Sequence, residues 1–124
     1  MPDLSAYRWQ NRLLLLFAPT ADHPAYQTLG RELEEQAKGV KDWGLIVFRV
    51  LEAGRSFQNG DELSPEQAQA LRQRFAAPPG AFTVVLVGKD GGVKLNEARR
   101  VPLADIFALI DSMPMRRQEM QERQ

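Results

Sequence analysis

The sequence predicts an α/β domain with the element order β-α-β-α-β-β-α and a four-stranded mixed sheet that carries helices on both faces. Three observations lead to this prediction. An unbroken aliphatic run at residues 13–17 is typical of a strand buried on both faces. A helical stripe separates this run from a second apolar run at residues 43–51, as in a parallel βαβ unit. Asp90 and Gly91 then lie between two further strand patterns and indicate a hairpin.

The first half of the chain reads as a strand, a helix and a strand. Pro19 ends the aliphatic run too early for a helix, so we expect a strand over residues 11–18. Pro24 suits the first position of a helix that ends near Gly39, and His23 then stands in the capping place. The apolar face of this helix is formed by Tyr26, Leu29, Leu33, Ala37 and Val40.

The second half begins with residues 52–63, which are polar and contain glycine, so we expect a surface loop there. Ser64, Pro65 and Gln67 form a complete start signal for the next helix, which ends before Pro78. The remaining elements are expected at residues 82–87 and 93–95, both strands, and at residues 103–113, a helix.

This order is the minimal thioredoxin-like arrangement, in which a parallel βαβ half precedes an antiparallel ββα half and a helix joins the two. By that analogy the strands lie in the order second, first, third, fourth. The first and last helices share one face of the sheet, and the middle helix covers the other. Because no repeat or linker interrupts the pattern, we expect residues 1–124 to form a single domain, with residues 115–124 as a polar C-terminal tail.

Composition and charge exclude several classes of protein. Of the 124 residues, 44% are hydrophobic and 26% are charged, which is typical of a globular domain. Sixteen Lys and Arg balance sixteen Asp and Glu, so we expect no nucleic-acid partner. Cysteine is absent, which excludes thiol catalysis, and a single histidine leaves little to hold a metal, so we expect no metal and no cofactor. The longest apolar run is too short to cross a bilayer, so we expect no membrane insertion.

Three stretches of the sequence carry a family resemblance: YRWQNRLLLLFAP at residues 7–19, FTVVLVGKDGGVK at residues 82–94 and MPMR at residues 113–116. They resemble the bacterial family known as domain of unknown function 4174, and similar domains occur in extracellular, sushi-repeat-containing matrix proteins. The resemblance implies a thioredoxin-like fold related to peroxiredoxins, often in periplasmic or secreted proteins, and brings no established activity. The residues themselves leave localisation open, because a domain of this size can be stable without disulfides in oxidising or reducing surroundings. The first residues lack the pattern of a signal peptide.

Two positions differ from those of the redox-active thioredoxins. In thioredoxins the redox cysteines follow the first strand, where a helix N-terminus stabilises a thiolate. Here residues 19–23 contain no thiol. The cis-proline that cradles substrate before the third strand aligns with Phe82, so the usual peptide clamp is also in question.

The candidate site residues fall in two places, and each has a structural alternative. Asp22 and His23 are the acid–base candidates in the loop after the first strand, although His23 equally suits a helix cap. The candidate binding residues are Arg8, Trp9, Arg12, Thr20, Phe82 and Lys89. Trp9 with its neighbouring arginines could stack on and pair with a flat or anionic ligand. We favour the alternative, in which Trp9 packs against the sheet edge and the arginines stay solvated.

The leading functional hypothesis is a non-catalytic module that binds a protein partner or a second copy of itself. The alternative is an enzyme of unassigned type that uses Asp22 and His23 as acid and base, with Arg12 or Lys89 contacting an anion. A nucleic-acid binder is the third hypothesis, and the balanced charge speaks against it.

Overall fold

The computed structural model describes residue 7 and residues 9–113. Two of the sequence predictions, Arg8 as a binding residue and residues 115–124 as a polar tail, lie outside the described residues. Ten elements follow one another along the chain: β1 (Arg12–Ala18), α1 (Pro24–Glu35), α2 (Ala37–Asp42), β2 (Leu45–Leu51), β3 (Ser56–Gln58), β4 (Asp61–Leu63), α3 (Pro65–Arg74), β5 (Thr83–Val87), β6 (Val93–Glu97) and α4 (Leu103–Asp111).

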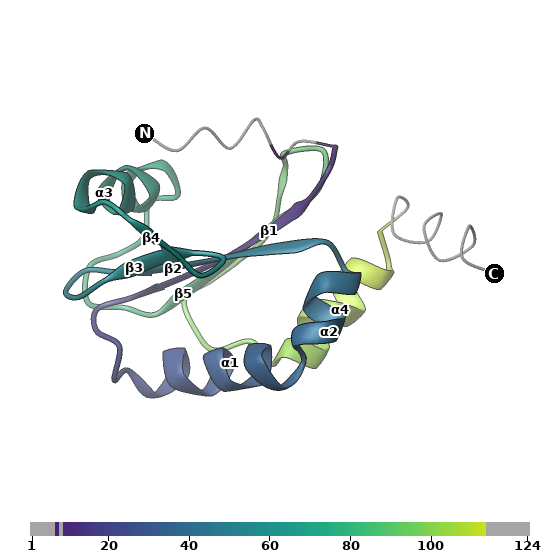
Figure 1. Cartoon of the computed structure of the whole chain (residues 1–124), viewed down its shortest axis with the longest axis horizontal. Helices are drawn as coiled ribbons and strands as arrows, with labels where there is room; N and C mark the ends of the chain where they lie inside the picture. Colours follow the sequence, from purple (N-terminus) through teal and green to yellow (C-terminus); the bar gives the residue numbers. More distant parts are fainter. Residues whose placement is uncertain (1–6, 8, 114–124) are drawn as a thin grey trace.

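The sheet has six strands in the order β4-β3-β2-β1-β5-β6 (Figure 1). Strand β1 lies at its centre, parallel to β2 and antiparallel to β5, with Leu14 opposite both Val47 and Leu86. All seven residues of β1 are buried, as predicted for a strand covered on both faces. The order β2-β1-β5-β6 confirms the predicted order of second, first, third and fourth strands.

The predicted surface loop at residues 52–63 is wrong, because this segment contains the hairpin of β3 and β4 and enlarges the sheet from four strands to six. Asn59 and Gly60 form its turn with φ of 51° and 95°, and Asn-Gly with positive φ at both positions is a favoured two-residue hairpin turn. The backbone N–H of Asn59 also donates to Val47 O in β2. Each strand is three residues long, too short for an alternating pattern to stand out.

Two hydrophobic layers lie on opposite faces of the sheet. Helices α1, α2 and α4 cover one face, over a core that includes Leu16, Leu29 and Ile106. Helix α3 covers the other face, where Leu71 packs with Phe17 and other residues. Figure 1 shows the three helices on one side of the strands and α3 on the other, which confirms the predicted distribution. No helix formed by the described residues is both long and apolar enough to cross a membrane.

The predicted helix starts are confirmed in atomic detail. His23 caps α1, with Pro24 in its first turn, and Ser64 and Gln67 form a complete capping box at α3. The single helix expected over residues 24–39 is divided into α1 and α2 at Gln36. The predicted strand over residues 43–51 begins later, at Leu45, because Trp43 caps α2 and Gly44 follows with a φ of 65° that favours glycine.

Candidate functional site

In the loop after β1, the side chains of Thr20 and Asp22 contact each other, and that of His23 points to a different partner. Thr20 Oγ1 donates a hydrogen bond to Asp22 Oδ1, and both residues are exposed. Among the hydrogen bonds of the described residues, none joins Asp22 to His23. The Asp22 carboxylate therefore does not orient the imidazole, which a catalytic pair of base and carboxylate requires.

His23 is occupied as a structural residue. Its Nδ1 accepts a hydrogen bond from the backbone N–H of Ala25 at 3.2 Å, which puts the proton of the neutral ring on Nε2. Its ring stacks on Phe82, with 5.8 Å between centroids and 18° between planes. Phe82 is itself only 4% exposed and belongs to the core under α1. Phe82 stands directly before β5, and its equivalence to the thioredoxin cis-proline stays a prediction.

A second group of candidates lies at the opposite end of β1, about 20 Å away given the rise of a seven-residue strand. Trp9 has a φ of 69°, and its backbone N–H donates to Lys89 O in the turn between β5 and β6. The Trp9 side chain is 58% exposed, and Val93 at the start of β6 is 53% exposed. Trp9 is thus more than half exposed, and its packing against the sheet edge stays a prediction. We call Trp9, Lys89 and Val93 the Trp9 patch.

The turn that carries the Trp9 patch is held by Asp90. Its Oδ1 accepts the Gly92 N–H at 2.9 Å, and its Oδ2 pairs with Lys94 Nζ at 2.9 Å. The Gly92 N–H, followed by the Lys94 ammonium, holds the pKa of Asp90 below its ordinary value of 3.8. Its charged carboxylate therefore supports the turn at neutral pH.

Arg12 belongs to neither group. It is 1% exposed, and Nη1 donates to Trp43 O, at the C-terminal end of α2, at 3.0 Å. The expectation that Arg12 stays solvated is wrong, because it begins a strand that is buried along its whole length. Its guanidinium ties the end of a helix to the sheet, where a cation is favourable next to carbonyl groups. A ligand at the surface does not reach it.

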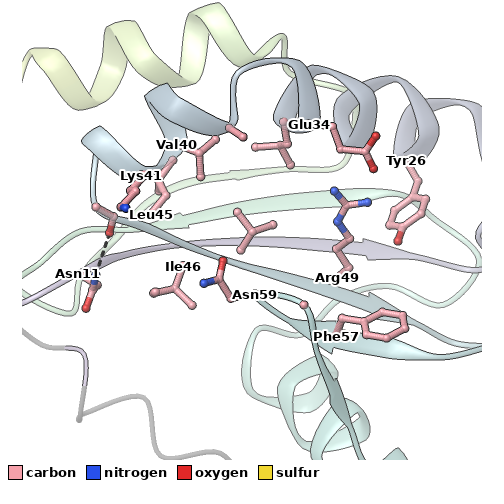
Figure 2. A pocket seen from close by; sticks show the side chains of 15 residues that line it. Asn11, Tyr26, Glu34, Val40, Lys41, Leu45, Ile46, Arg49, Phe57 and Asn59 are labelled. Atoms are coloured by element: carbon pink, nitrogen blue, oxygen red, sulfur yellow. Dashed lines mark hydrogen bonds between the residues drawn. The ribbon is translucent and has the colours of Figure 1, made fainter.

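A groove that the sequence did not predict lies between the helices α1 and α2 and the strands β2 and β3 (Figure 2). Its volume is about 760 Å³, within the range of small-molecule sites. Leu45 and Val47 form part of its floor, Leu33 and Val40 part of its wall. Its polar groups are Asn11, Tyr26, Glu34, Lys41, Arg49 and Asn59.

Arg49 rises from β2 into one end of this groove. Figure 2 shows its guanidinium between Glu34 and Tyr26. The guanidinium carbon lies 5.9 Å from the centre of the Tyr26 ring, and Nη2 approaches Gly30 O at 3.5 Å. One sequence signal could have found this site: Arg49 is the single charged residue in the apolar strand LIVFRVL. A charge inside such a strand needs a partner or water.

Within residues 7 and 9–113, no three side chains of the histidine, aspartate or glutamate type come together as metal ligands.

The fold is similar to that of solved peroxiredoxins from Plasmodium. The reduced 2-Cys peroxiredoxin of Plasmodium vivax matches with a TM-score of 0.65 and 12% identity, over 98% of this chain and 85% of that chain. Thioredoxin peroxidase I of Plasmodium yoelii matches with a TM-score of 0.64 and 14% identity, over 93% and 79% of the two chains. At this identity the likeness is one of fold, and it confirms the thioredoxin-like architecture.

Sequence similarity extends to a vertebrate protein. Coiled-coil domain-containing protein 80 of zebrafish is 34% identical over 133 residues, which cover 94% of this chain and 15% of that protein. The bacterial setting suggested by the sequence resemblance stays an expectation beside this vertebrate relative. The family described as domain of unknown function (DUF4174) matches residues 3–119. The chain belongs to this family.

Proposed function

We propose that this chain is a non-catalytic thioredoxin-like module that binds a protein partner or a second copy of itself through the Trp9 patch. The observation that carries the proposal is the exposure of two large apolar residues at the same end of the sheet: Trp9, 58% exposed and bonded through its N–H to Lys89 O, and Val93, 53% exposed and opposite Val87. Tryptophan is the residue type most enriched where binding energy concentrates in protein interfaces.

The backbone geometry of the patch also supports binding. The hydrogen bond from Trp9 N–H to Lys89 O holds the main chain of Trp9 against the β5–β6 turn. A side chain presented from a fixed backbone loses less conformational freedom when it is buried by a partner. The zebrafish relative is named for a coiled-coil domain, and coiled coils associate protein chains. A role in protein association is consistent with that name.

The loop after β1 supports a binding role over the enzymatic alternative. The chain has no cysteine, so it lacks the thiol that a peroxiredoxin or thioredoxin uses. Asp22 accepts its hydrogen bond from Thr20, and His23 uses Nδ1 for the α1 cap. Asp22 and His23 therefore stabilise the loop and the start of α1, and they do not form an acid–base pair with each other.

The proposal is tested with a variant whose tryptophan fluorescence comes from Trp9 alone. The sequence has two tryptophans, and Trp43→Phe leaves Trp9 as the single emitter. We expect its emission to shift to the blue, and its quenching by acrylamide to fall, as the protein self-associates or binds a partner isolated with it. We expect Trp9→Ser to weaken that association about tenfold or more. Gln73→Ala, an exposed change on α3, is the control and leaves it unchanged.

Two outcomes contradict the proposal. One is an association, measured by sedimentation, that has the same strength in the Trp9→Ser variant and in the unmodified chain. The other is turnover of a peroxide or another substrate by the purified chain that disappears in both Asp22→Ala and His23→Ala. The second result would establish the enzymatic alternative.

A further inference from the structure

We propose that the groove between α1–α2 and β2–β3 binds a small carboxylate with an apolar body, and that Arg49 holds the carboxylate group. The groove shares no residue with the Trp9 patch, so this ligand site is independent of the proposed function. Its shape and charge together identify the chemical class of the ligand (Figure 2).

The apolar part of the ligand is indicated by the floor and wall of the groove. Leu33, Leu45 and Val47 belong to one hydrophobic core, with Val40 packed against it, and their edges line a groove of about 760 Å³. Arg49 lies four residue steps beyond Leu45 along β2, which corresponds to about 13 Å of groove length. An elongated aliphatic or aromatic body fits such a space and removes apolar surface from water.

The charged part of the ligand is indicated by Arg49. The ion pairs found in the described part of the chain do not include it. Its neighbours are the carbonyl of Gly30 and the ring of Tyr26, and neither neutralises its charge. A half-buried guanidinium pairs best with a planar carboxylate, because two parallel N–H groups reach two oxygens.

Gly30 makes room for this guanidinium. The residue lies inside α1, where glycine costs about 1 kcal/mol of helix stability relative to alanine. A Cβ built on Gly30 would stand 3.1 Å from Arg49 Nη1, closer than side chains ordinarily approach. The missing side chain thus allows the guanidinium to lie against the helix backbone at one end of the groove, with Nη2 donating to Gly30 O.

Glu34 and Lys41 define the charge of the ligand more closely. Glu34 lines the groove near Arg49, so a doubly charged phosphate is repelled more strongly than a singly charged carboxylate. Lys41 lies at the other end and is exposed, where water weakens its attraction. Arg49 is therefore the anchor, and a monocarboxylate is favoured over phosphates and acidic peptides.

The experiment uses octanoate as the probe and octan-1-ol as its uncharged counterpart, with binding followed by calorimetry and by backbone amide shifts in NMR spectra. We expect saturable octanoate binding that shifts the amides of Val47 and Gly60, and weaker binding of octan-1-ol. Arg49→Gln weakens octanoate binding about tenfold or more, because a charge-assisted hydrogen bond is lost. Arg49→Lys weakens it less.

Matched variants keep the test decisive if an Arg49 variant folds poorly. Glu34→Gln removes a nearby negative charge at an exposed position, so we expect it to tighten octanoate binding about twofold to fivefold. Glu35→Gln and Arg31→Gln make the same charge changes at exposed positions of α1 that do not line the groove, and leave affinity unchanged.

Several results would overturn the assignment. They are octanol binding as tightly as octanoate, a larger effect of Lys41→Gln than of Arg49→Gln, amide shifts confined to the β5–β6 turn, and inorganic phosphate or an acidic peptide displacing octanoate at equal concentration. Absence of saturation below the concentration at which octanoate self-associates would also overturn it. Apart from amide shifts at the β5–β6 turn, which would place octanoate at the Trp9 patch, these results leave the proposed function untouched.

Discussion

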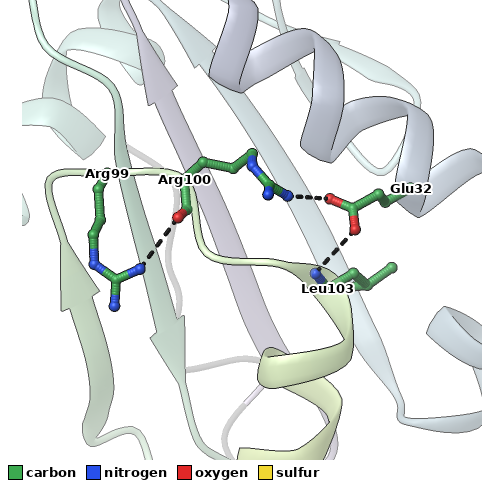
Figure 3. A network of polar contacts seen from close by, with 4 residues as sticks. All are labelled: Glu32, Arg99, Arg100 and Leu103. Carbon is green, nitrogen blue, oxygen red and sulfur yellow. Dashed lines mark hydrogen bonds and ion pairs between the residues drawn. The ribbon is translucent and has the colours of Figure 1, made fainter.

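Glu32 on α1 caps the N-terminus of α4 from a different helix. Its Oε2 accepts the backbone N–H of Leu103 at 3.4 Å, while Oε1 pairs with Arg100 at 3.2 Å (Figure 3). Helix α4 needs this contact because Pro102 occupies its N-cap position and offers no side-chain acceptor. The contact joins two helices that lie 68 or more positions apart in the chain and cover the same face of the sheet.

We therefore expect Glu32→Ala to lower the free energy of unfolding by about 1 kcal/mol, the usual cost of losing a helix cap. Glu32→Gln keeps an acceptor oxygen and loses less. Arg100→Ala removes the partly exposed ion pair alone and costs about 0.5 kcal/mol or less. Urea denaturation of the three variants measures these differences. Equal losses for Glu32→Ala and Arg100→Ala would show that the cap contributes nothing.

His23 gives a second prediction, on the start of α1. His23→Ala removes the acceptor for the Ala25 N–H and the stack on Phe82, so we expect a loss of about 1 kcal/mol or more in unfolding free energy. His23→Asn restores a good cap without the aromatic ring and recovers part of the loss. Thermal unfolding followed by circular dichroism compares the two variants. Equal stability of both with the unmodified chain would contradict the structural role of His23.

The β3–β4 turn gives a third prediction. Gly60 has a φ of 95°, which side chains rarely adopt, so Gly60→Ala costs about 1–2 kcal/mol. Asn59→Gly keeps the turn conformation accessible and serves as the control. Hydrogen exchange of the Asn59 amide, which donates to Val47 O, reports on the hairpin directly. Unchanged protection in Gly60→Ala would contradict the prediction.

The pH dependence of stability gives a fourth prediction, at Asp90. Because folding holds the pKa of Asp90 below 3.8, its carboxylate stabilises the folded state above that pH. The contribution is lost as the pH falls through the lowered value. The stability difference between the unmodified chain and Asp90→Asn is thus constant near neutral pH and shrinks in strong acid. The stability difference between the unmodified chain and Lys94→Gln should also shrink in strong acid, since Lys94 is the charged partner of Asp90. A difference that grows in acid would contradict this assignment.

Much of the architecture followed from local patterns. The run at residues 13–17 placed the central strand, and Ser64 and Gln67 located the start of α3 because a capping box is formed by residues three positions apart. The β3–β4 hairpin was missed although its Asn-Gly turn signal is present at residues 59 and 60. Its strands gain their stability from pairing with β2, which a short segment does not reveal by its own composition.

The site could be predicted in part. The contact between the loop after β1 and Phe82 follows from the predicted strand order, because that order brings the ends of β1 and β5 together. Arg12 was assigned the wrong environment, since burial depends on what packs over a residue and not on its type.

By itself, the sequence determined the absence of thiol chemistry, the balanced charge, the two-faced burial of β1 and the helix starts, because composition and short-range hydrogen bonds do not depend on distant residues. The tertiary structure decided which ends of the sheet the polar residues share, which helix supplies the cap of α4, and that Arg49 rises into a groove beside Gly30. These relationships join segments far apart in the chain, and only the packing of helices on a twisted sheet brings them within contact distance.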